Sequence, residues 1–553
     1  MKNVLLVLPI FLLAQCNDTD KNALIVYNGK NHPQKAKEEF TKEIVKTWPL
    51  KDLVKDTIPG ISLSRAYKEF IKDKAGDSVI VALIDMPVKI SHPDIRNHLW
   101  RNTGEIPNNK KDDDYNGYID DLNGWNFLGN EKGENRVFMN YEYTRWLKKY
   151  GADFLSKASP EDSLLVKRYQ MAQADYDKRY EYAVGQLKKA DSIETAFKKH
   201  KDLMQSHLGK KAYTSADLDT VKKENPSDKM LLESVNFLEK MFSRNRDSAW
   251  VHNNTLQAKN RLEILLNLEG DDRKLTGDDP TDLKDSHYGN PIINHNLDLL
   301  GHETRMAGVI LSTYGNPELG TLMGKIQLMP IPISGLGDEH DKDMALAIRY
   351  AVDNGAKVIN ISSGKYYSLY EDWVHDAIRY AEQNDVLIVA SSGNKGLDLD
   401  LPDSYKYPSD VDSERNEISN NFIRVGESNY VLDSTIVHPA TNYGKTQVDV
   451  FAPGEEIYTT STKKSGYTYS SGTSAAAAMV SKLAAIIRSY YPDLDVGSLK
   501  ELLLESGVAY DTPVYKKTAK GVRDIVPFNQ LSKSGKVINA YNAFLTLEKM
   551  KRK

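Results

Sequence analysis

Three stretches of the sequence, far apart along the chain, carry side chains suited to nucleophilic chemistry. Ser474 stands between a polar stretch predicted as a strand and an apolar stretch predicted as a helix that runs to about residue 489. Asp85 ends a buried-strand pattern, and His302 opens a predicted helix. A serine hydroxyl attacks carbonyl groups when an imidazole removes its proton and a carboxylate orients the imidazole. We therefore predict that Asp85, His302 and Ser474 meet in one catalytic site.

A second set of groups is predicted to stabilise the negative charge that such an attack creates. A serine at a strand-to-helix turn has its backbone N–H at the positive end of the helix dipole, where an oxyanion can bind. Asn394 follows another buried-strand pattern, and its carboxamide can donate a hydrogen bond without a charge to desolvate. We expect Asn394 and the Ser474 N–H to form an oxyanion hole.

The order Asp, His, Ser along the chain is the order found in subtilisin, as distinct from chymotrypsin or the α/β-hydrolases. The surrounding motifs resemble those of the subtilisin-like serine proteases (subtilase family, peptidase S8) over about residues 75–130 and 277–545. These motifs are Ser91-His92-Pro93-Asp94, then Thr304, Ala307 and Gly308 after the histidine, and Gly472-Thr473-Ser474-Ala475 around the serine. The resemblance implies a serine endopeptidase that hydrolyses proteins or peptides through an acyl-enzyme, with no cofactor in the chemistry.

The resemblance also implies where a substrate binds. In this family, the segment that matches Ser362-Ser363-Gly364 pairs as a β-strand with the substrate backbone, and we expect the same here. The pocket for the substrate side chain should be walled by this segment and by residues 390–393. The residues at those positions are Ser362, Ser363, Gly364, Ser392 and Gly393.

Several residues beside these motifs depart from the family pattern. Pro87 replaces a glycine, Glu303 and Arg305 replace a glycine and a histidine, and Ala478 and Met479 replace a Pro-His pair. The alternative function is therefore a catalytically weak or inactive subtilisin-like protein that binds other proteins in the cell envelope. A lipase or esterase is disfavoured, because Ser474 lacks a Gly-x-Ser-x-Gly elbow and the histidine precedes it.

Strand and helix patterns alternate downstream of His302. Residues 325–333, 356–361 and 386–390 read as strands, and residues 341–354 as a helix. This alternation predicts an α/β fold with a doubly wound, mostly parallel sheet that has helices on both faces.

The stretch between Asp85 and His302 is several times longer than in compact members of the family. Residues 131–276 are rich in Lys, Glu, Tyr and Leu at helical spacing and predict an inserted α-helical subdomain. The insertion is either a tolerated surface excursion or a device that guards the cleft or recruits a protein partner. The expected division is a signal peptide (1–16), an N-terminal arm (17–76), a catalytic domain (77–130 and 277–545), the insertion, and a basic tail (546–553).

The N-terminus has a basic start and a short apolar run, as export signals do. Leu13-Ala14-Gln15-Cys16 resembles a bacterial lipobox, so we expect an exported lipoprotein of the cell envelope, attached to the membrane through a lipid on Cys16. Plain secretion is the alternative. Cys16 is the only cysteine, which excludes internal disulfides, and a net charge of −4 gives no reason to expect nucleic-acid binding.

An acidic loop after the first catalytic strand suggests a cation site. Asp112, Asp114 and Asn116 alternate before Gly117, and Asp121 follows. Crowded carboxylates of this kind are costly unless a hard cation neutralises them. Two alternatives stay open, a structural Ca²⁺ site and a solvated acidic turn.

Overall fold

The computed structural model describes residues 23–27, 39–296, 299–517 and 523–552. Cys16 and the signal sequence lie outside the described residues. Within the described part of the chain, no helix is both long and apolar enough to cross a membrane.

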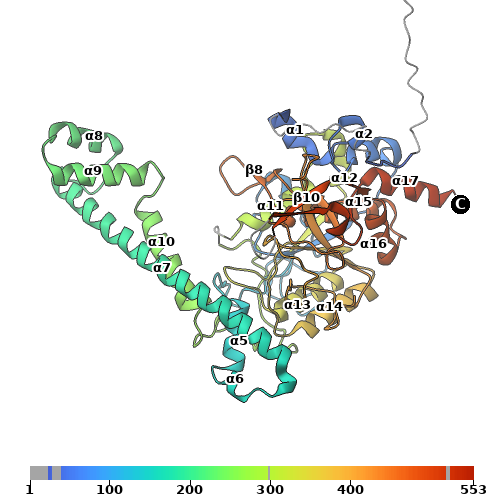
Figure 1. Cartoon of the computed structure of the whole chain (residues 1–553), viewed down its shortest axis with the longest axis horizontal. Helices are drawn as coiled ribbons and strands as arrows, with labels where there is room; N and C mark the ends of the chain where they lie inside the picture. Colours follow the sequence, from blue (N-terminus) through green and yellow to red (C-terminus); the bar gives the residue numbers. More distant parts are fainter. Residues whose placement is uncertain (1–22, 28–38, 297–298, 518–522, 553) are drawn as a thin grey trace, which may run out of the picture.

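A central eight-stranded sheet organises the molecule (Figure 1). All neighbouring strands run parallel except the last pair, which is antiparallel. This confirms the predicted α/β fold. The strand order is β2 (Ile326–Pro332), β1 (Val79–Asp85), β3 (Val358–Ile361), β4 (Leu387–Ser391), β5 (Phe422–Ser428), β6 (Val450–Pro453), β12 (Lys536–Val537) and β9 (Val508–Ala509).

Each face of the sheet is covered by its own hydrophobic core. Along β1 the side chains alternate, so Val81 and Leu83 enter one core and Ala82 and Ile84 the other. Burial on both faces explains why the strands read as continuous apolar runs. The first core contains α11 (Gly301–Leu311), α15 (Thr473–Tyr490), α16 (Val496–Glu505) and α17 (Ala540–Lys551), and the second contains α13 (Asp341–Asp353) and α14 (Glu371–Gln383).

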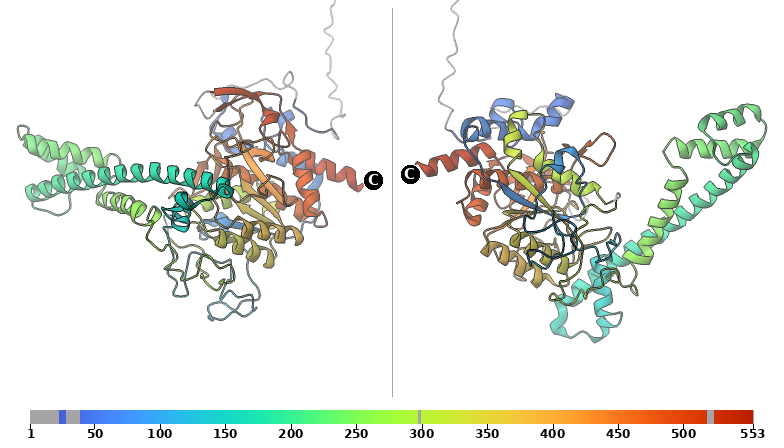
Figure 2. Two further views of the ribbon diagram at one scale, coloured as in Figure 1. Left: turned by 60° about the horizontal axis from the view of Figure 1, so that its bottom comes forward. Right: turned by 180° about the vertical axis from the view of Figure 1, so that it is seen from behind.

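The helical insertion projects away from the sheet as an arm (Figures 1 and 2). Its main element is α7 (Ser163–Leu208), a helix of 46 residues. The return path is built from α8 (Ser215–Glu224), α9 (Lys229–Phe242) and α10 (Ser248–Asn260). The outer part of the arm has its own core, which includes Phe197, Leu218, Val235 and Val251.

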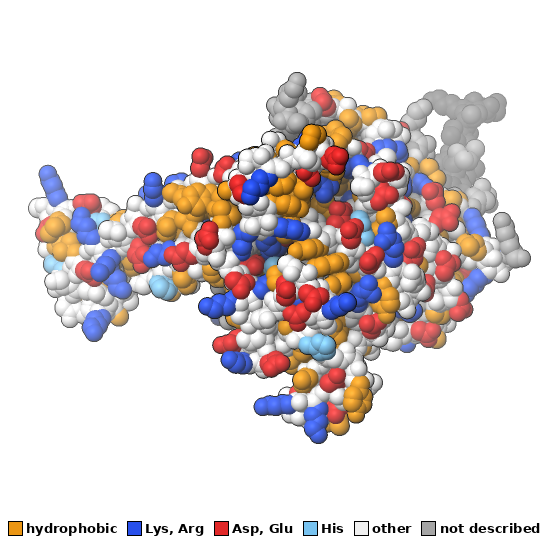
Figure 3. Space-filling model, turned by 90° about the horizontal axis from the view of Figure 1, so that it is seen from below, with side chains coloured by type: hydrophobic (Ala, Val, Ile, Leu, Met, Phe, Trp, Pro, Cys, Tyr) orange, Lys and Arg blue, Asp and Glu red, His pale blue; other side chains and the backbone are white. Residues whose placement is uncertain are grey.

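The base of the arm packs against the body, the domain that contains the central sheet. α5 (Glu142–Tyr150) precedes α7, and its Trp146 packs with Ala172 of α7 and Tyr367 of the body. The Tyr367 hydroxyl donates to Asp175 Oδ2 at 2.6 Å. On the face shown in Figure 3, acidic and basic side chains are interspersed over arm and body.

The N-terminal residues pack on the catalytic domain. Trp48, in a 3₁₀ turn after α1 (Lys42–Thr47), is fully buried, and its Nε1 donates to the Glu455 carbonyl at 3.1 Å. Ile61 is also fully buried, and its carbonyl oxygen accepts a hydrogen bond from the Ala540 N–H of α17 at 2.7 Å. An earlier stretch of the N-terminal residues contacts α17 as well, because Ile25 exchanges two hydrogen bonds with Asn542.

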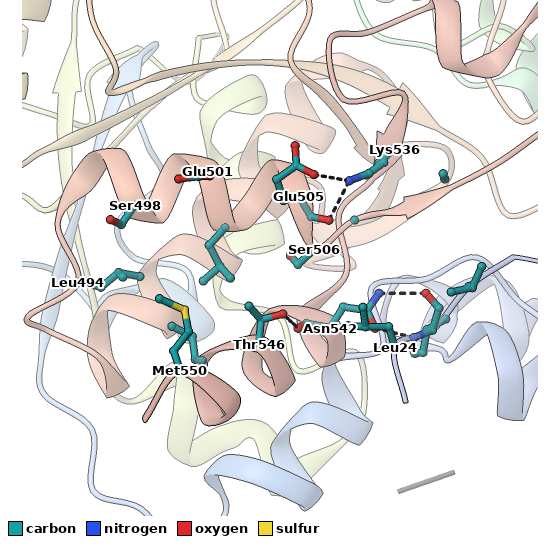
Figure 4. A pocket seen from close by; sticks show the side chains of 16 residues that line it. Leu24, Leu494, Ser498, Glu501, Glu505, Ser506, Lys536, Asn542, Thr546 and Met550 are labelled. Atoms are coloured by element: carbon teal, nitrogen blue, oxygen red, sulfur yellow. Dashed lines mark hydrogen bonds and ion pairs between the residues drawn. The ribbon is translucent and has the colours of Figure 1, made fainter. Parts of the chain in front are cut away.

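An apolar pocket of about 450 Å³ lies between this segment, α16 and α17 (Figure 4). Leu24, Leu494 and Met550 line it, and the ion pair between Lys536 and Glu505 closes one side. The N-terminal segment and the last helix therefore line the same pocket.

Candidate active site

The structure brings Asp85, His302 and Ser474 together at the carboxyl edge of the sheet. Asp85 is the last residue of β1, and His302 and Ser474 are the second residues of α11 and α15. His302 Nδ1 lies 2.9 Å from Asp85 Oδ2, and His302 Nε2 lies 3.2 Å from Ser474 Oγ. The imidazole thus stands between the carboxylate and the hydroxyl, the arrangement that a general base needs.

Small residues allow the helices to hold these side chains. α15 begins after Gly472, whose φ of +131° suits glycine. Gly308 sits so close to the hairpin strand β7 (Ile457–Thr460) that a methyl group on it would lie 2.3 Å from Thr460 Oγ1. The positions of Ser474 and His302 therefore depend on these two glycines.

The electrostatics of the pair favour a charged Asp85 and a basic His302. Burial by itself would raise the pKa of Asp85, but attraction and hydrogen bonding to His302, with the Met86 N–H, hold that pKa below its usual value. Burial would lower the pKa of His302, yet the Asp85 charge raises it above its usual value. His302 is therefore a stronger base than a free imidazole.

Asn394 lies just beyond β4 and borders the same cleft. Its Oδ1 accepts hydrogen bonds from the Thr473 backbone N–H at 3.0 Å and from the Thr473 hydroxyl at 3.1 Å. This fixes the amide orientation, and among the described residues Nδ2 has no acceptor. The Asn394 amide is free to donate to a ligand beside Ser474.

The cleft has a volume of about 350 Å³ and is walled by the two predicted segments. Ser362, Ser363 and Gly364 form one wall, and Gly393 lies in the other. Ser392 does not line the cleft, in contrast to the prediction. It is fully buried, and its hydroxyl donates to the Asn442 carbonyl at 3.1 Å. Ser391 takes its place, because neighbouring side chains at a strand end point to opposite sides.

Ser474 Oγ also lies 3.1 Å from the Ser362 carbonyl oxygen. Its single proton therefore has two acceptors within reach, this carbonyl and His302 Nε2. Rotation of the hydroxyl decides which of the two acceptors receives its proton.

A family model described as the subtilase family, Peptidase S8, matches residues 76–525. The chain belongs to the subtilase family. It is 31% identical over 271 residues to the cell wall-associated protease of Bacillus subtilis (strain 168). The match covers 47% of this chain and 27% of that protein. It is 32% identical over 196 residues to the thermophilic serine proteinase of Bacillus sp. (strain AK1), covering 35% of this chain and 44% of that protein.

The chain thus spans less than half the length of these two relatives. A solved structure of the subtilase cytotoxin SubAB assembly matches with a TM-score of 0.37 and 26% identity, covering 47% of this chain and 81% of that chain.

Glu303 is a buried acid next to Asp85 and His302 in this subtilase site. Its side chain is fully buried, and one carboxyl oxygen lies within 4.8 Å of ligand atoms of both Asp85 and His302. Burial, together with the Asp85 charge, raises the pKa of Glu303 well above its usual value. Ala478 and Met479, two other departures, are fully buried in α15.

A groove of about 460 Å³ continues the cleft of this subtilase toward the arm. Gly364, Tyr366 and Lys395 border both the cleft and the groove. The far wall belongs to α7, which contributes Asp175, Lys178, Arg179 and Tyr182. The base of the insertion therefore shapes the surface next to the cleft.

The acidic loop forms a carboxylate cluster with a different membership from the one predicted. Oxygens of Glu105, Asp114 and Asp121 lie within 4.8 Å of one another. Asp112 instead accepts the backbone N–H groups of Asn116 and Gly117, so it stabilises the turn. Burial raises the pKa of Asp121 to about 6.

The cluster is cross-linked by amide groups. Asn102 donates to Asp114 at 2.9 Å and to Asp121 at 2.7 Å, and Asn116 donates to Asp121 at 3.1 Å. The sequence analysis did not predict Glu105 as a member of the cluster, because it precedes the alternating acidic run.

Proposed function

We propose that the protein is a serine endopeptidase that cleaves proteins or peptides. The observation that carries the proposal is the chain of contacts from Asp85 through His302 to Ser474. The relatives named as proteases support the same reaction class.

In the proposed mechanism, Ser474 Oγ attacks the carbonyl carbon of a peptide bond while His302 Nε2 takes the hydroxyl proton. Asp85 holds the imidazole by Nδ1 and stabilises the imidazolium that forms. The oxyanion accepts hydrogen bonds from Asn394 Nδ2 and the Ser474 N–H. The imidazolium then protonates the leaving amine, and water repeats these steps on the acyl-enzyme to release the acid.

A fluorophosphonate probe tests this assignment because it reacts with activated serines. The purified protein should be labelled on Ser474, and Ser474→Ala should abolish labelling. Ser471→Ala is the matched control, since Ser471 is an exposed serine three positions away whose hydroxyl, among the described residues, bonds only the Glu456 N–H. Well-folded protein that neither takes the label nor cleaves casein would instead support a protein-binding module.

We also propose that the protein is an exported lipoprotein of the cell envelope, with its lipid on Cys16. The support is the N-terminal sequence alone. Detergent-phase partitioning of the expressed protein tests it, and Cys16→Ser should move the protein to the aqueous phase. A wild-type protein that stays in the aqueous phase favours plain secretion.

We propose further that the acidic loop binds a structural Ca²⁺ ion. Glu105, Asp114 and Asp121 would hold it with Asn116, because Ca²⁺ takes carboxylate and amide oxygens. The ion would neutralise the cluster and stiffen the loop. Excess EGTA should lower the Tm, and Asp114→Asn should reduce this effect more than Asp112→Asn. An EGTA-insensitive Tm argues for a solvated turn.

A further inference from the structure

A buried lysine lies between the two walls of the cleft. The Lys406 side chain passes beneath Gly364 and Gly393. A methyl group on Gly364 would lie 1.7 Å from Lys406 Nζ, and one on Gly393 would lie 3.3 Å from Cε. Nζ donates to the carbonyl oxygens of Ser363 at 3.2 Å and Tyr407 at 2.9 Å. The ammonium therefore forms part of the floor between the segments that border Ser474.

No carboxylate pairs with Lys406. Among the described residues, no carboxylate oxygen lies within 4.0 Å of Lys406 Nζ, and the residue is only 5% exposed. Lys365 provides the contrast, because it is equally buried but lies 2.8 Å from Asp341 and 3.2 Å from Glu142. Burial lowers the pKa of Lys406 to about 8. The Lys406 ammonium contacts two neutral acceptors and has one N–H left to donate, and the carboxylate that attracts it most, Glu339, is beyond ion-pair distance.

We propose that Lys406 selects substrates with an aspartate or glutamate side chain immediately before the cleaved bond. This inference rests on the proposed peptidase function. A carboxylate entering between the two walls would accept the remaining N–H of Lys406 and neutralise its charge. Such a charge-assisted hydrogen bond in a buried site is stronger than one between neutral groups.

The main competing group in the cleft is Glu339. It borders the same space, and its Oε1 has no hydrogen-bond partner among the described residues. A carboxylate there would favour a basic substrate side chain. Burial raises the pKa of Glu339, although the nearby charges of Lys365 and Lys406 act in the opposite direction. Lys406 is placed better for an incoming side chain, because its Nζ lies against Gly364 between the two walls.

The experiment compares peptides that differ only in the residue before the cleaved bond: Asp, Glu, Asn, Gln, Leu or Lys. The full-length protein should cleave the Asp or Glu peptide with kcat/KM about tenfold or more above that of the Asn, Gln and Leu peptides. Lys406→Met keeps most of the aliphatic stem, and it should remove this preference while the Leu peptide is still cleaved. Lys395→Met is the matched control, because Lys395 borders the cleft but lies 3.5 Å from the centre of the Tyr366 ring. It should retain the preference for acidic residues.

The outcomes separate the inference from the proposed function. If the protein takes the fluorophosphonate label but prefers peptides with Lys or Leu before the cleaved bond, the role of Lys406 is overturned and the peptidase function stands. An acidic preference that survives Lys406→Met would also overturn it. If Lys406→Met fails to fold, the preference of the wild-type protein still decides, because a wild type without acidic selectivity contradicts the proposal. Absence of both labelling and cleavage would count against the peptidase itself.

Discussion

The carboxyl groups of Glu303 and Asp85 lie within 4.8 Å of each other in a region closed to solvent, where Glu303 is 0% and Asp85 1% exposed. Two adjacent carboxylates cannot both ionise there without a large cost. Since Asp85 also faces the His302 imidazole, Asp85 carries the charge and Glu303 keeps its proton. A neutral Glu303 can donate to Asp85 and help to fix the carboxylate beside His302.

Substitutions of Glu303 should distinguish this donor role from simple space filling. Glu303→Gln keeps an N–H donor at the same position, so kcat/KM should stay within about threefold of wild type. Glu303→Leu fills the space without a donor and should lower kcat/KM by about tenfold or more. Steady-state kinetics on one peptide, with the Tm of each variant as a folding control, checks this. Equal losses in both variants would show that hydrogen bonding from residue 303 is unimportant.

Removing the Asn394 amide should affect turnover more than binding. Asn394→Ala is expected to lower kcat by about 10²–10³ with KM little changed, a magnitude taken from the equivalent type of donor in subtilisin. Thr473→Val removes one of the two donors to Asn394 Oδ1 and should cause a smaller loss. A kcat that survives Asn394→Ala would assign the oxyanion to other donors.

The pH profile should report the altered basicity of His302. The general base must be neutral, so kcat/KM should fall as the pH decreases through the pKa of His302. Because Asp85 raises that pKa, the fall should begin above the usual histidine value of about 6.5. Asp85→Asn should shift the midpoint to lower pH and reduce kcat by about 10⁴, as for the same change in other Asp-His-Ser enzymes. An unshifted midpoint in Asp85→Asn would mean that another group titrates.

The groove beside the cleft should matter only to longer substrates. Arg179 of α7 borders it, next to Tyr141, whose hydroxyl it contacts at 3.0 Å. Arg179→Ala should raise KM about threefold or more for peptides of eight or more residues and leave short chromogenic peptides unaffected. Arg244→Ala, at an exposed position on the outer arm, should change neither. Equal effects on short and long peptides would argue against binding in the groove.

Much of the fold followed from the sequence because parallel strands are buried on both faces and read as apolar runs. The run that ends at Asp85 became β1, and the turn before Ser474 became the start of α15. Asp85 could be placed at the carboxyl edge of the sheet because it ends a strand pattern, and the resemblance to subtilases implied that His302 and Ser474, at the starts of two helices, meet it there.

The details that sequence reasoning missed depend on which way single side chains point. Ser391 and Ser392 exchange roles because a step of one residue reverses direction at a strand end. Lys406 sits in an irregular loop, and its approach to the cleft is possible only because Gly364 and Gly393 lack side chains. Neither effect leaves a periodic signal.

The helix α7 is long enough to carry the outer end of the insertion far from the active site. At 1.5 Å per residue, its 46 residues extend over about 70 Å, more than the width of a small domain. The core at its outer end is built from residues of the insertion alone. Mutations there should therefore leave cleavage at Ser474 unchanged, so any effect that they have on the protein can be assigned to the insertion itself.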